Sequence, residues 1–98
     1  MPFDTTLDPT TDVILGAIDY LEKYGWRKGG KRGPDEEGCV LQAMCAAAAH
    51  RAPDLLTRAV RRVERANGII CLPFWNDAQG RTKEQVLEAL RNSLITGE

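Results

Sequence analysis

The stretch "PFWNDAQGRT", residues 73–82, gathers several side chains that could bind another molecule. Trp75 stands directly before two hydrogen-bonding side chains, Asn76 and Asp77, and Arg81 follows four residues after Asp77. The same residues also suit a structural turn, because Asn and Asp side chains bond their own backbone and glycine tolerates a positive φ. The stretch is therefore either a binding loop or only the path into the last helix.

A second tryptophan, Trp26, lies in another expected loop. Tryptophan is enriched at interface hot spots, so two tryptophans in loops favour a contact surface. We predict a partner-binding site formed by Trp26, Trp75, Asn76, Asp77 and Arg81. In the structural alternative, Phe74 and Trp75 hold the loop against the core and Arg81 bonds to Asp77.

Arginines form a second pattern, a basic stripe on one expected helix. Arg58, Arg61, Arg62 and Arg65 follow i, i+3, i+4, i+7 spacing, which puts four guanidinium groups on one face. Together with Arg51 they could neutralise phosphates of DNA or RNA. A solvated helix face is the plainer interpretation, because no aromatic residue is interleaved with the arginines. Nucleic-acid binding therefore stands as the alternative function.

The cysteines offer little chemistry. Cys39 starts an expected helix, but the single histidine, His50, is eleven residues later, about 16 Å along the axis. No Cys–His pair forms at that distance, and C-x5-C-x4-H matches no zinc pattern. The odd count of three cysteines suits reduced thiols. The glycines of "KGGKRG" also lack the features of a phosphate-binding loop. We expect no catalytic residue, metal or cofactor, and hence a non-enzymatic protein.

Apolar periodicity predicts the elements that must position these residues. Helices are expected at residues 11–24, 37–50 and 54–66, and a last helix begins after Thr82 as N-cap, with Gln85 completing a capping box. A charged, Gly-rich loop spans 26–37, and Asn67-Gly68 ends the third helix. "IICL" at 69–72 is expected to be a short, buried extended segment. The fold class is thus all-α, a compact four-helix single domain with one short extended segment before the last helix.

Composition agrees with one domain over residues 1–98, of which 1–10 are a candidate flexible tail. The chain is 43% hydrophobic and 28% charged, as in ordinary globular proteins. No apolar run is long enough for a membrane helix. The first twelve residues carry three acids and no Lys or Arg, the wrong sign for a signal peptide, so we expect a cytoplasmic location. Net charge is −1, with acids concentrated in residues 1–24 and arginines in 50–67.

Several of these pieces together resemble a family of small uncharacterised bacterial and phage proteins. The resemblance rests on "YLEKYGW", "CVLQAM" and "WNDAQGRTKEQVLEAL", and covers roughly residues 13–94. It implies signature positions at Trp26, Cys39, Trp75, Asn76, Asp77, Gly80, Arg81 and Thr82. Gln42 departs from the family's usual glycine, which puts close helix packing at that point in question. The family brings no established activity.

We therefore expect a small cytoplasmic accessory or binding protein that acts through protein–protein interaction. A phage or mobile-element inhibitor is the form that the resemblance implies. The partner's identity and the oligomeric state stay open.

Overall fold

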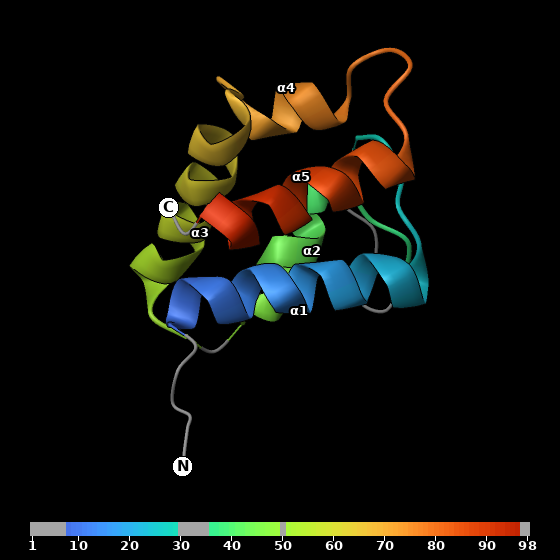
Figure 1. The fold of residues 1–98 in the computed structure, drawn as a ribbon. Helices are drawn as coiled ribbons and strands as arrows, with labels where there is room; N and C mark the ends of the chain where they lie inside the picture. Colours follow the sequence, from blue (N-terminus) through green and yellow to red (C-terminus); the bar gives the residue numbers. More distant parts are fainter. Residues whose placement is uncertain (1–7, 30–35, 50, 97–98) are drawn as a thin grey trace.

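The structure is a computed structural model and describes residues 8–29, 36–49 and 51–96. In these residues the chain forms five helices and no strand: α1 (Pro9–Tyr24), α2 (Val40–Ala47), α3 (Pro53–Asn67), α4 (Leu72–Asn76) and α5 (Lys83–Thr96). In Figure 1, α1 and α5 lie side by side with opposite chain directions, and α2 lies behind them. The α3 helix closes one end and leads to α4 at the top of the view. The predicted all-α single domain is confirmed.

Local capping sets the ends of α1. Asp8 Oδ1 accepts a hydrogen bond from Thr11 N at 2.8 Å. Pro9 occupies the first turn, where its missing backbone N–H costs no helical hydrogen bond. The helix stops at Gly25, whose positive φ of 99° is open to glycine and whose N–H bonds to Leu21 O. One isolated parallel bridge, Trp26 to Gly38, then brings the two ends of the charged loop together.

The second helix is shorter than predicted. Cys39 is its N-cap, with Sγ accepting from Gln42 N at 3.4 Å, so residues 37–39 are outside it. Cys45 and Ala46 are exposed, so one face of this part of the helix meets solvent. Close packing on α1 nevertheless occurs, because a Cβ at Gly16 would lie only 2.8 Å from Ala47 Cβ.

The third helix ends as predicted and begins differently. Gly68 takes the left-handed conformation with φ 65° and donates to Glu64 O, as Asn67-Gly68 indicated. At the start, Ala52 is the N-cap without a side-chain bond, and Asp54 lies within the first turn. Pro53 occupies the first position of α3, where a proline ring suits the helical φ and no backbone N–H is needed.

The region 69–76 differs most from expectation. The predicted extended segment is limited to the stretch before α4, where Cys71 has φ −143°. Leu72–Asn76 forms the unexpected helix α4, and Glu64 Oε2 caps its start by accepting from Leu72 N at 2.8 Å. The expected burial of the segment is also wrong at Ile70, which is 97% exposed.

The last helix begins with the predicted capping box. Gln85 N donates to Thr82 Oγ1 at 3.2 Å, and Thr82 N donates to Gln85 Oε1 at 3.1 Å. All five helices contribute buried side chains to one core, which comprises Val13, Ile14, Ala17, Leu21, Val40, Ala43, Met44, Leu55, Ala59, Val63, Leu72, Val86, Leu87 and Leu90.

Candidate functional site

Asn76 is the centre of the predicted binding loop, and its side chain is 1% exposed. Its Oδ1 accepts from Trp26 Nε1 at 2.7 Å and from Val40 N at 3.0 Å. Its Nδ2 donates to Asp77 Oδ1 at 2.9 Å and to Arg27 O at 3.5 Å. One amide therefore joins α4, the start of α2 and the loop after α1.

Asp77 continues this network at the surface. Its Oδ1 also accepts from Gly29 N at 2.6 Å. The pKa of the Asp77 carboxyl lies below its ordinary value because Asn76 and Gly29 donate to it and Lys28 is nearby. The carboxylate is thus engaged in holding the 25–29 segment against α4.

Arg81 and Trp75 form a stacked pair. Arg81 Cζ lies 3.9 Å from the Trp75 ring centroid, and Arg81 Nε donates to Trp75 O at 2.8 Å. Arg81 Nη1 reaches Gln85 Oε1 at 3.3 Å. No hydrogen bond or ion pair joins Arg81 to Asp77 in the described residues, so the expected bond between them is wrong: Arg81 bonds to Trp75 and Gln85, and Asp77 bonds to Asn76 and Gly29.

The structure therefore brings all five predicted site residues together around α4. The polar side-chain groups of Trp26, Asn76 and Asp77 bond to other segments of the chain and not to their own backbone. Trp75 and Arg81 lie at the surface side of the cluster, where both line an open groove of about 430 Å³.

This groove contains two residues that the sequence interpretation did not select. Ile70 is 97% exposed and Phe74 is 79% exposed, which corrects the expectation that Phe74 packs on the core. The complete lining is Gly68, Ile69, Ile70, Cys71, Phe74, Trp75, Ala78 and Arg81. The groove is thus an apolar surface with one guanidinium at its edge.

The sequence around 69–76 indicates this surface only once the burial of Leu72 and Asn76 is known. Leu72 and Asn76, four residues apart, are both buried, so residue 74 between them must point away from the core once a helix forms there. Ile69 and Ile70 are adjacent, and in an extended segment neighbours face opposite sides. The indication also depends on recognising α4 as a helix.

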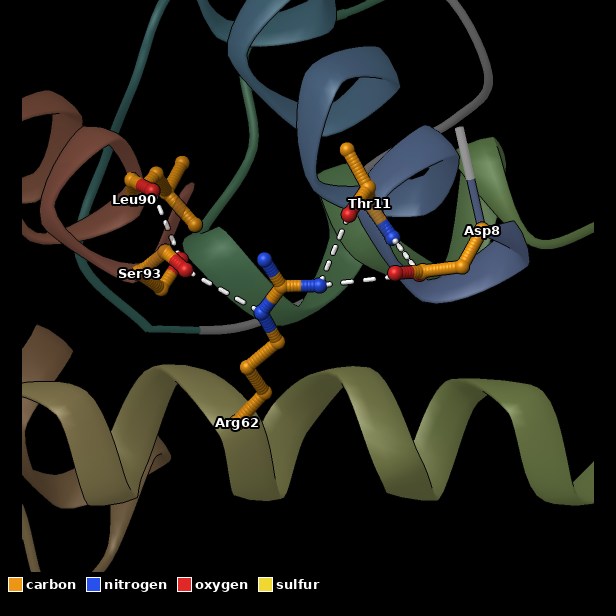
Figure 2. Close-up of polar contacts among 5 residues, drawn as sticks. All are labelled: Asp8, Thr11, Arg62, Leu90 and Ser93. Carbon is orange, nitrogen blue, oxygen red and sulfur yellow. Dashed lines mark hydrogen bonds and ion pairs between the residues drawn. The ribbon is translucent and has the colours of Figure 1, made fainter. Parts of the chain in front are cut away.

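The basic stripe is divided by the fold. Arg62 is only 8% exposed and faces inward from α3 (Figure 2). Its Nε donates to Ser93 O at 3.0 Å, and its Nη1 donates to Thr11 Oγ1 at 2.8 Å and lies 3.6 Å from Asp8 Oδ1. Arg62 therefore ties α3 to both α1 and α5, a structural use of the residue.

Ser93 and Asp8 are themselves held in place. Figure 2 shows Ser93 Oγ directed at Leu90 O, to which it donates at 2.6 Å. The pKa of Asp8 lies below its ordinary value, chiefly because Thr11 N donates to its carboxylate, with Arg62 adding to the effect. The guanidinium thus meets partners already fixed by two helices.

The other arginines of the stripe are exposed. Arg58 pairs with Asp54 at 3.5 Å, and Arg51 pairs with Asp12 at 2.6 Å. Arg61 and Arg65 form no hydrogen bond or ion pair with any described residue. All four arginines of α3 line a hollow of about 430 Å³ beside Asp8, and Arg61 and Arg65 extend with Ile69 into a second hollow of about 270 Å³.

The cysteines and ionisable groups form no cluster of catalytic type in the described residues. Cys39, Cys45 and Cys71 are free thiols, and Cys39 serves as a helix cap. His50 lies outside the described residues. Within them no group of three His, Cys, Asp or Glu side chains could hold a metal ion, and no helix is long and apolar enough to span a membrane.

Comparison with known families matches residues 5–93 to the model of a family of unknown function, DUF6197. The chain belongs to this family. The match confirms the resemblance to an uncharacterised family, and it covers every helix except the end of α5. No curated protein and no solved structure matches the chain. Family membership therefore assigns no chemistry, and the surface itself carries the functional argument.

Proposed function

We propose that this family member is a binding protein that holds an apolar segment of another protein in the groove between the end of α3 and α4. The observation that carries the proposal is the exposure of two large apolar side chains, Ile70 at 97% and Phe74 at 79%, on one groove. Isolated surface apolar residues are common, but a group of them around a hollow is typical of interaction sites.

The neighbouring contacts support a rigid site. Trp75 is held by the Arg81 stack on one side, and α4 is fixed by the Asn76 and Glu64 bonds. A preformed groove loses little conformational entropy on binding, and aromatic anchors contribute strongly to interfaces. The predicted loop thus supports the groove, with Trp75 and Arg81 in direct reach of a partner and Trp26, Asn76 and Asp77 behind them.

The setting that we propose with this function is a small accessory protein or inhibitor of the cytoplasm, bacterial or phage-derived.

A display library of random peptides, selected on the immobilised protein, tests the proposal. We expect enriched peptides that bind wild type and lose binding to the double variant Ile70→Ser/Phe74→Ser. Ile95→Ser is the matched control, because Ile95 is 82% exposed on α5 and lies outside the groove. If no selected peptide distinguishes wild type from the double variant while both fold, the groove is not a protein-binding site.

Nucleic-acid binding is the second candidate, and it is favoured by Arg61 and Arg65, which are exposed and have no partner among the described residues. Arg62 contributes less than the spacing suggested, since its guanidinium bonds internally. Anisotropy with labelled duplex DNA and single-stranded RNA separates the two. A nucleic-acid protein keeps binding near physiological salt, and Arg61→Gln/Arg65→Gln flattens the salt slope. An unchanged slope contradicts this candidate.

A further inference from the structure

The groove has positively charged edges on two sides. Arg81 lines it at the α4–α5 side, with its guanidinium flat on Trp75. Ile69 lines both the groove and the adjoining hollow, whose other members include Arg61 and Arg65. Apolar side chains thus lie between cationic groups from α3 and from the segment that joins α4 to α5.

Two acids beside the groove, Glu64 and Asp77, already accept hydrogen bonds. Glu64 is the one acid among the described residues that line the groove and the adjoining hollow, and its Oε2 accepts from Leu72 N at 2.8 Å. Asp77, the nearest acid to Trp75 in sequence, accepts from Gly29 and Asn76. Arg61 and Arg65 are left without a partner in the described part of the chain. Like charges four residues apart on a helix repel, so an incoming anion would relieve this repulsion.

We infer that the groove binds an acidic, apolar peptide segment, in which Leu, Ile or Phe side chains alternate with Asp or Glu. The apolar side chains would pack on Ile70, Phe74 and Trp75, and the carboxylates would meet Arg61, Arg65 and Arg81. Charge complementarity of this kind sets partner choice and association rate. The inference rests on the proposed function and names the chemistry of its partner.

Two other occupants fit less well. In a two-fold dimer the same patch meets itself, so the cationic edges of two copies would face one another. Single-stranded nucleic acid could stack on Phe74, but most of the lining is aliphatic or small, and the chain carries a net charge of −1. A short acidic peptide with apolar side chains is complementary both to the apolar lining of the groove and to the arginines beside it.

The test uses the peptides that bind the groove, as judged by loss of binding to Ile70→Ser/Phe74→Ser. We expect them to be rich in Asp and Glu beside large apolar residues. A labelled member is then titrated against wild type and Arg61→Gln/Arg65→Gln, with fluorescence anisotropy as the readout. The double variant should bind about tenfold more weakly, since two exposed ion pairs are lost, and wild-type affinity should fall as salt rises.

Arg58→Gln is the matched control. It removes one positive charge from the same helix, but Arg58 lines neither the groove nor the adjoining hollow. The affinity of the Arg58→Gln variant for the labelled peptide should stay within about twofold of wild type, because a charge outside the binding site contributes little.

Each remaining outcome has a distinct meaning. Groove-binding peptides without acids, or an affinity indifferent to Arg61 and Arg65, overturn the inference and leave the proposed function standing. No groove-dependent peptide at all overturns both. Binding of labelled oligo(dT) that is lost in Ile70→Ser/Phe74→Ser, or a dimer in light scattering that this variant dissolves, assigns the groove to nucleic acid or to a second copy and also overturns the inference.

Discussion

Asn76 has more partners than any other residue of the predicted loop, and its partners come from three segments. Trp26 Nε1 and Val40 N both donate to its Oδ1, inside a region where water is excluded. A buried donor without an acceptor is destabilising, so the amide matters more for stability than its size suggests. The residue-scale predictions follow from this and from two charged groups.

Asn76→Ala should lower the free energy of unfolding by about 2–4 kcal/mol, because two donors lose their acceptor and a small cavity forms. Urea denaturation measures the change. Asn92→Ala is the control, since Asn92 is exposed and bonds only to Asn67 Oδ1 at 3.2 Å, and it should stay within about 0.5 kcal/mol of wild type. Equal stability of the two variants contradicts the role given to Asn76.

Arg62 and Arg61 are neighbours with opposite environments. Arg62→Gln should lower the free energy of unfolding by about 2–4 kcal/mol, because Ser93 O and Thr11 Oγ1 lose a charged donor. Arg61→Gln should change it by less than about 0.5 kcal/mol. Thermal and urea unfolding of the pair give the comparison, and a similar loss in both variants would exclude the inward role of Arg62.

Asp77 makes a pH-dependent contribution. Its folded-state pKa is depressed, mainly by the Asn76 bond and next by the Gly29 bond. The stabilisation is therefore fully present above its unfolded pKa of about 3.9 and is lost as pH falls through the lower folded value.

Asp77→Asn tests this contribution, because the amide keeps an oxygen that can accept from Gly29 N. Between about pH 5 and pH 2, the free energy of unfolding should fall less steeply in the variant than in wild type. Asp8, also depressed in pKa, acts in the same direction in both proteins and cancels in the difference. Parallel pH profiles contradict the prediction.

At the scale of elements, the contact between α1 and α2 depends on small residues. The Gly16 Cα faces Ala47, and a Cβ there would come within 2.8 Å of Ala47 Cβ. Ala47 belongs to a run of four alanines at 46–49, whose small side chains permit a close helix approach. Glycine inside a helix costs about 1 kcal/mol in propensity, which the close approach offsets.

Gly16→Ala should therefore lower the free energy of unfolding by about 1–2 kcal/mol, despite alanine's better helix propensity. Adding Ala47→Gly should relieve the clash, so Ala47→Gly is less destabilising in the Gly16→Ala background than in wild type. Ala46→Gly, at an exposed neighbouring position, should give no such relief. Additive effects in this double-mutant cycle would show that the helices separate freely.

At the scale of the whole molecule, three ion pairs join α1 and its N-cap to other parts of the chain. Arg51 pairs with Asp12, Arg62 with Asp8, and Arg91 of α5 with Glu22. The Cα radius of gyration, 12.7 Å, is that of one compact domain of about 100 residues. What this packing leaves at the surface is the apolar groove with Arg61 and Arg65 beside it.

The groove should be separable from the fold. Ile70→Ser/Phe74→Ser should melt within about 3 °C of wild type, because both side chains are already in water. Leu72 lies between them in sequence and is fully buried, so Leu72→Ser should lower the free energy of unfolding by about 3–5 kcal/mol. Circular dichroism melts measure both, and a collapse of the double variant would mean that the exposed residues support the fold.

Local rules predicted much of the architecture. The Thr82–Gln85 capping box and the Asn67-Gly68 stop act over a few residues, so the sequence carries them directly. Helix α4 escaped prediction because its five residues are too short for apolar periodicity, and its cap, Glu64, comes from the previous helix.

By itself, the sequence determined the fold class, the long helices and the residues that gather around position 75. The tertiary structure alone decided which of them face a partner. Asn76 meets Trp26 from 50 residues away and Arg62 meets Thr11 from 51, so neither burial was legible in local spacing. Helix packing buried the side chains of Asn76 and Arg62 and left Ile70 and Phe74 exposed, because burial depends on contacts between segments distant in sequence.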